Sequence, residues 1–107
     1  MAEEFVKVTE VAELEPGQMK MVEWGEDQVL LVNLDGSFYA CDNICTHAGA
    51  PLNEGSLEGD LVECPLHGSI FNVTNGEVVG PPAEDNLRLF QVRVDGQDVL
   101  VGPPTNN

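Results

Sequence analysis

The sequence predicts an all-β fold. Short runs of alternating or β-branched apolar residues are separated by turn residues, and no internal repeat or helical heptad is present. Asp35-Gly36 and Asp95-Gly96 lie between apolar runs, where type I′ hairpin turns require positive φ, and Asn75-Gly76 offers the same chemistry. The one helical candidate, 10–15, is ended by Pro16-Gly17 after little more than one turn. We therefore expect antiparallel strands joined by three hairpins.

The expected strands are short runs of apolar and β-branched residues, of the length typical of an antiparallel sheet. In chain order they cover residues 4–8, 19–23, 28–34, 37–40, 60–63, 70–72, 87–94 and 97–101.

The chain length and the placement of glycine and proline predict the domain organisation. One hundred and seven residues suffice for one domain with a modest core. Between Cys41 and Ala83 the strands shorten, and glycines and prolines concentrate. We therefore expect a single domain over 1–107, with a β base from 1–42 and 84–102 and a loop-rich lobe from 43–83. The tail 103–107 has nothing to bury and is expected to fray.

The charge balance excludes several classes of function. The chain has 4 Lys and Arg residues against 19 Asp and Glu residues, a net charge of -15. Such a surface repels phosphate backbones and anionic lipids, so we expect neither nucleic-acid nor membrane binding. No apolar run approaches the roughly 20 residues of a membrane span, and the acidic N-terminus is unlike a signal peptide. These features predict a cytoplasmic protein.

Both histidines and two of the three cysteines fall in the predicted lobe. They form the segments Cys45-Thr46-His47 and Cys64-Pro65-Leu66-His67-Gly68, separated by 16 residues. Thiolate and imidazole donors suit zinc or an iron-sulfur cluster, whereas calcium and magnesium prefer oxygen. The third cysteine, Cys41, has no histidine at either spacing, and we expect it to be a packed thiol. A Cys₂His₂ metal site is the leading interpretation.

The pattern Cys-x-His, 16 residues, Cys-Pro-x-His-Gly resembles the Rieske iron-sulfur signature. This resemblance implies an antiparallel β-sandwich base with a small inserted cluster-binding lobe. It also implies one 2Fe-2S cluster, with one iron bound by Cys45 and Cys64 and the other by His47 and His67. Replacing two thiolates by imidazoles raises the potential above that of all-cysteine clusters.

Further positions indicate a branch of that family. High-potential Rieske proteins carry a disulfide whose cysteines match Ala50 and Leu66 here, and a tyrosine that matches Phe71. Their serine donor to the cluster matches Ser69, to which the resemblance assigns a role in tuning the cluster. The sequence is therefore most similar to the soluble, low-potential ferredoxins of bacterial aromatic-ring-hydroxylating dioxygenase systems.

The residues that remain after the four cluster ligands are assigned indicate an electron carrier and not an enzyme. A Rieske oxygenase also needs a mononuclear iron site with two further histidines. The chain has two histidines, and the resemblance assigns both to the cluster. The resemblance implies a one-electron carrier in aromatic hydrocarbon catabolism, placed between a flavin-containing ferredoxin reductase and a terminal oxygenase. We expect a monomer that docks through a small apolar collar beside the histidines. The collar residues are Ala48, Pro65, Leu66 and Pro81.

Two alternatives remain open from the sequence. The first is a Rieske-like small subunit of another redox enzyme, such as assimilatory nitrite reductase. The second is a structural Cys₂His₂ zinc domain used for protein interaction, although zinc fingers rarely mix their pairs as Cys-x-His.

Overall fold

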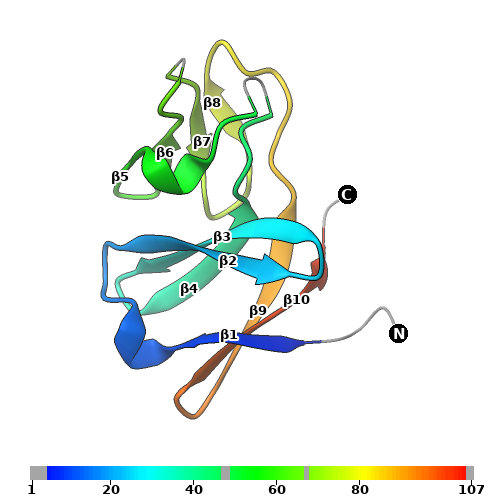
Figure 1. Ribbon diagram of the computed structural model, residues 1–107. Coiled ribbons are helices and arrows are strands. Elements are labelled where there is room, and N and C mark those ends of the chain that lie inside the picture. Colours follow the sequence, from blue (N-terminus) through cyan, green and yellow to red (C-terminus); the bar gives the residue numbers. More distant parts are fainter. Residues whose placement is uncertain (1–4, 47–48, 67, 106–107) are drawn as a thin grey trace.

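The computed structural model describes residues 5–46, 49–66 and 68–105 (Figure 1). Over these ranges the chain forms antiparallel strands in two sheets, with two single turns of 3₁₀ helix between strands. The predicted all-β class is therefore confirmed.

The larger sheet forms the base of the molecule. Its strand order is β1-β10-β9-β4-β3-β2, with every neighbouring pair antiparallel. The expected helical segment is reduced to one 3₁₀ turn, η1 (Val11–Glu13). The strands of this sheet are β1 (Val6–Glu10), β2 (Met19–Trp24), β3 (Asp27–Leu34), β4 (Ser37–Asp42), β9 (Leu89–Asp95) and β10 (Asp98–Pro104).

The smaller sheet lies between β4 and β9 along the chain and stands beside the base in space (Figure 1). The 3₁₀ turn η2 (Leu52–Glu54) precedes it. Its strands, in the order β5-β6-β7-β8, are β5 (Ser56–Glu58), β6 (Leu61–Glu63), β7 (Ile70–Asn72) and β8 (Val78–Gly80). The sequence predicted β6 and β7 but not β5 and β8, the two strands at the edges of this sheet.

All three expected hairpins are present. Asp35 and Gly36 join β3 to β4 with φ of 58° and 96°, the two positive angles that a type I′ turn requires. Gly76, at φ 78°, lies in the β7–β8 connection. In the β9–β10 turn Gly96 has φ 65° but Asp95 stays extended and pairs with Asp98. That hairpin is confirmed, although its turn is not type I′.

The expectation of a frayed tail is wrong for residues 103–105. Strand β10 passes a register shift after Val101 and continues until Pro104 pairs with Phe90. The Thr105 N–H then donates to the Leu89 carbonyl at 2.8 Å. The shift lets the chain follow β9 although prolines donate no backbone hydrogen bond. Residues 106 and 107 lie outside the described ranges.

Two hydrophobic clusters meet at β3, because successive strand residues point to opposite faces of the sheet. Val29 and Leu31 belong to the base core, whereas Leu30 and Val32 face the smaller sheet, and all four are fully buried. Each such side chain contributes about 1.5–3 kcal/mol of burial free energy. The cluster on the second face, here called the lobe core, consists of Leu30, Val32, Cys41, Cys45, Ala50, Leu52, Val62, Cys64, Phe71, Val73, Ala83 and Leu87.

A salt bridge joins the two points where the chain leaves and re-enters the base. The Asp42 N–H donates to the Arg88 carbonyl at 3.0 Å, and the Arg88 N–H donates to Asp42 Oδ2 at 2.8 Å. The guanidinium of Arg88 also donates to Asp42 Oδ1 at 2.8 Å and to Asp27 at 3.3 Å. The hydrogen bond to Asp42 raises the pKa of Arg88 above its usual value. These contacts attach the segment that contains Cys45 and Cys64 to the base sheet.

Candidate metal centre

Cys45 and Cys64 begin two turns with the same backbone hydrogen bonds. The Cys45 N–H donates to the Ala50 carbonyl at 2.9 Å, and the Gly49 N–H donates back to the Cys45 carbonyl at 3.0 Å. The second turn repeats this pattern, with Cys64 N–H to Ser69 carbonyl at 2.8 Å and Gly68 N–H to Cys64 carbonyl at 3.2 Å.

The glycine four residues after each cysteine explains why this turn forms twice. Gly49 has φ 69° and Gly68 has φ 79°, in the left-handed region that side chains other than glycine rarely adopt. The turns that begin at Cys45 and Cys64 therefore share their closing hydrogen bonds and a glycine in the left-handed region.

The two thiols occupy one buried environment. Cys45 and Cys64 are each 2% exposed and belong to the lobe core. All three cysteines are described, and none takes part in a disulfide. His47, Ala48 and His67 lie outside the described residues.

The donor set fits an iron-sulfur cluster. Among the described residues, no group of three or more His, Cys, Asp and Glu side chains is gathered that could hold a metal ion. Cys45 and Cys64 offer two thiols that are buried in the same core cluster, and soft thiolates are the ligands that iron-sulfur clusters take.

The Ser69 carbonyl closes the second cysteine turn by accepting from the Cys64 N–H. The side chain of Ser69 is fully buried, and its Oγ accepts a hydrogen bond of 3.0 Å from the Ala83 N–H. A hydroxyl that accepts one bond can still donate its own proton. Phe71, fully buried two residues later, has no hydroxyl to add a second donor.

Thr46 makes a contact that the sequence did not reveal. Its hydroxyl donates to the Asp85 carbonyl at 2.7 Å, across 39 residues of sequence. The segment 81–87 is thus joined to the first cysteine turn through Thr46 and to the second through Ser69. Ser69 was singled out from the sequence, but its contact with Ala83 and the contact between Thr46 and Asp85 arise only in the folded arrangement.

The third cysteine differs from the other two. Cys41 is fully buried on β4, where it pairs with Leu30 and Leu89 of the neighbouring strands. Burial and then the nearby Asp42 carboxylate raise the pKa of the Cys41 thiol to about 12. At neutral pH it is therefore a protonated, apolar side chain, as expected for a packed thiol.

The expected docking residues are exposed where the structure describes them. The Leu66 residue is 59% exposed, and Pro65 and Pro81 are also exposed.

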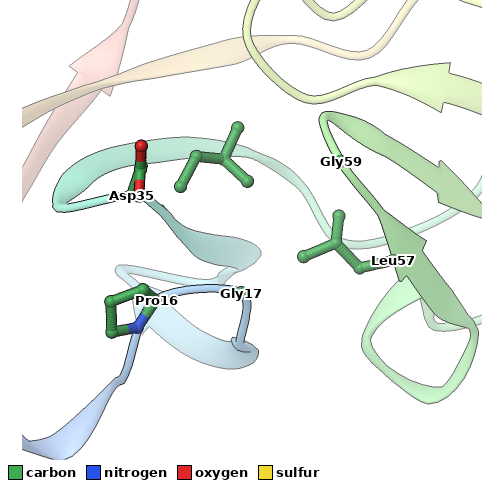
Figure 2. A pocket seen from close by; sticks show the side chains of 6 residues that line it. Pro16, Gly17, Asp35, Leu57 and Gly59 are labelled. Atoms are coloured by element: carbon green, nitrogen blue, oxygen red, sulfur yellow. The ribbon is translucent and has the colours of Figure 1, made fainter.

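A separate cavity of about 440 Å³ lies between the base and the smaller sheet. Figure 2 shows Leu57 of β5 facing Pro16 and Asp35 of the base across it. Of the predicted ligand, tuning and docking residues, none of those that the structure describes lines it. It is therefore distinct from the cysteine site.

No helix in the described ranges is both long and apolar enough to cross a membrane.

Comparison with known proteins identifies the class to which this fold and its paired cysteine turns belong. The model of the Rieske [2Fe-2S] domain matches residues 4–100, and the chain belongs to that family. As a family member it carries a Rieske-type 2Fe-2S cluster, and it is an electron-transfer protein rather than a catalytic subunit.

Individual known proteins are similar to this chain over most of its length. The biphenyl dioxygenase ferredoxin subunit of Pseudomonas sp. (strain KKS102) is 41% identical over 98 residues, which cover 91% of this chain and 90% of that protein. Human apoptosis-inducing factor 3 is 44% identical over 94 residues, which cover 88% of this chain but 16% of that protein. A chain in the solved complex of reduced oxygenase and oxidised ferredoxin in carbazole 1,9a-dioxygenase superposes with a TM-score of 0.91 at 33% identity, covering 96% of this chain and 97% of that one.

Proposed function

We propose that this chain carries single electrons in the cytoplasm from a flavin-containing ferredoxin reductase to the terminal oxygenase of an aromatic-ring dioxygenase system. The observation that carries the proposal is the pair of matched turns that place Cys45 and Cys64 in one buried core. The likeness to a dioxygenase ferredoxin subunit over 90% of that protein supports the choice of partners.

The proposed ligands are Cys45 and Cys64 on one iron and His47 and His67 on the other. Two thiolates and two neutral imidazoles contribute a charge of about -2, whereas four thiolates contribute about -4, so this set favours acceptance of an electron. When bound, the cluster supplies one-electron transfer. The protein holds the thiols away from water in the lobe core. The Ser69 hydroxyl, whose oxygen accepts from the Ala83 N–H, would donate its proton to a sulfur acceptor.

The proposed docking surface is the apolar collar defined above. The exposed side chains of Leu66, Pro65 and Pro81, together with Ala48, would meet the partner close to the histidines. In this proposal the lobe 43–83 carries the cluster and the docking surface, and the base 1–42 and 84–102 supports it. The protein works as a monomer.

Metal analysis of the purified protein tests the proposal. We expect about two irons and two acid-labile sulfides per chain and, after reduction, the electron paramagnetic resonance (EPR) signal of a mixed nitrogen and sulfur cluster. A colourless protein with one zinc would support the structural zinc domain instead. Electron delivery to a sirohaem reductase but not to an oxygenase would support the small-subunit alternative.

A further inference from the structure

The two cysteine turns are supported in different ways. The second turn caps a hairpin: β6 and β7 pair from Leu61 and Asn72 up to Glu63 and Ile70, and the Cys64 to Ser69 bond extends that ladder. The first turn follows β4 and leads into η2, and its ladder is reduced to the isolated bridge between Ile44 and Pro51. Some other contact must therefore hold the two ends of the first loop together.

The side chain of Asn43 makes that contact. Its Nδ2 donates to Asn53 Oδ1 at 2.8 Å, and its Oδ1 accepts from the Asn53 N–H at 2.9 Å. The Leu52 N–H also donates to the Asn43 carbonyl, at 2.6 Å. These three bonds close the loop 43–53, which contains Cys45, at its base.

The same residue attaches the loop to the base sheet. The Asn43 N–H donates to the Gln28 carbonyl at 3.0 Å, and Nδ2 also lies 3.4 Å from Gln28 Oε1. Gln28 is part of β3, whereas the Cys64 turn sits on the smaller sheet. The position of Cys45 relative to Cys64 therefore depends on where Asn43 holds the first loop.

The chemistry of burial supports a geometric role. Asn43 is fully buried, and burying an amide is unfavourable unless its hydrogen bonds are made. An apolar residue of the same size would bury more favourably but could not join two segments.

We propose that Asn43 is the positioning residue of the first ligand arm: its buried amide closes the loop 43–53 and sets the place of Cys45 against Cys64. This inference rests on the ligand set proposed above.

Asn33 provides a matched control. It is also a buried asparagine, 3% exposed, whose Nδ2 donates to the Leu14 carbonyl at 2.7 Å and whose Oδ1 accepts from the Gly36 N–H at 2.8 Å. It closes a turn of the base and supports neither cysteine turn. Asn33→Leu and Asn43→Leu thus remove comparable hydrogen bonds at different places.

The test compares Asn43→Leu and Asn33→Leu in the cluster-loaded protein. Three quantities are measured: resistance to urea, the rate at which the visible cluster absorption is lost in a chelator, and the EPR g-values. We expect both variants to lose stability, but only Asn43→Leu to lose the cluster about tenfold faster and to shift the g-values. A tenfold change matches the typical effect of leaving a buried polar partner unsatisfied. Equal cluster-loss rates and unshifted g-values in the two variants would overturn the inference.

A milder pair applies if Asn43→Leu does not fold. Asn53→Asp keeps an oxygen that can accept from Asn43, whereas Asn53→Leu removes it and leaves the backbone bond in place. We expect faster cluster loss in Asn53→Leu than in Asn53→Asp, and equal rates would contradict the role of Asn43. A wild-type protein without a 2Fe-2S cluster would instead refute the proposed function.

Discussion

The Oγ atom of Ser69 accepts a hydrogen bond of 3.0 Å from the backbone N–H of Ala83. This bond fixes the oxygen of a fully buried side chain at the base of the second cysteine turn. Accepting this bond uses one lone pair of the oxygen and leaves the hydroxyl proton available to donate to another group. A donor aimed at a cluster sulfur stabilises the reduced state, which carries more negative charge.

Replacing Ser69 by alanine is therefore expected to lower the reduction potential. A hydrogen bond worth about 1 kcal/mol more in the reduced state corresponds to roughly 40 mV for one electron. Protein-film voltammetry of Ser69→Ala measures the change. Ser56→Ala, which alters an exposed serine on β5, is the control and should leave the potential unchanged. An unaltered potential in Ser69→Ala would show that the hydroxyl proton points elsewhere.

Gly55 lies against the backbone of the second cysteine arm. A Cβ at this position would overlap the Glu63 carbonyl oxygen and lie 3.2 Å from Pro65 Cδ, on either side of Cys64. The φ of Gly55 is -86°, which other residues also adopt, so space is what requires glycine here.

Gly55→Ala is expected to displace Cys64 and reduce the amount of cluster bound after purification by half or more, because overpacking costs about 1–3 kcal/mol. The iron content per chain measures the amount of cluster that remains bound. The control is Gly59→Ala in the β5–β6 turn, where φ is +60° and nothing lies within 4 Å of an added Cβ. That variant costs about 1–2 kcal/mol through backbone strain but should keep its full iron content. Full loading of Gly55→Ala would contradict the close approach.

Local chemistry made much of the fold predictable. The Asp35-Gly36 turn carries its own conformational preference, and the spacing of the cysteines and histidines predicted paired ligand arms without structural knowledge. Strands β5 and β8 carried no such signal, because their pairing partners rather than their own residues define them. The contacts of Asn43 and Gly55 join segments about ten residues apart that only the fold brings together.

Cys41 is expected to make the protein less stable in alkali. Its folded pKa of about 12 lies above the ordinary value of 9.0, so the unfolded chain releases this proton first as the pH rises. The stability contributed by the protonated thiol is complete below pH 9 and is lost between there and pH 12. The slope in that window is about 1.4 kcal/mol per pH unit.

Urea unfolding of the wild type and Cys41→Ala between pH 8 and about 11 measures how the free energy of unfolding depends on pH in each protein. The difference between the two slopes isolates Cys41, because the other groups titrate in both proteins. We expect the variant to fall less steeply and to retain the cluster spectrum, whereas Cys45→Ala should lose that spectrum. Parallel slopes would show that the thiol ionises as in the unfolded chain. Loss of the spectrum in Cys41→Ala would make Cys41 part of the cluster site.

Leu66 and Val94 allow the docking surface to be tested against a matched position. Both are exposed apolar side chains, 59% and 48% respectively, but Leu66 lies on the second cysteine turn and Val94 near the β9–β10 hairpin of the base. Leu66→Asp places a charge at the proposed contact, so we expect it to slow electron delivery to the oxygenase at least tenfold while the visible spectrum stays intact. Val94→Asp adds the same charge away from the contact and should leave the rate near that of the wild type.

Varying the salt concentration in the same experiment distinguishes the effect of the docking contact from that of electrostatic steering. The net charge of -15 is expected to draw the protein toward a basic partner, and the Debye length falls from about 10 Å at 0.1 M to about 3 Å at 1 M salt. Stopped-flow rates of the wild type should therefore fall as salt rises, and the difference between Leu66→Asp and Val94→Asp should persist at high salt because it arises at the contact. Rates that do not depend on salt would remove electrostatic steering. Equal rates for the two aspartate variants would place the docking surface elsewhere.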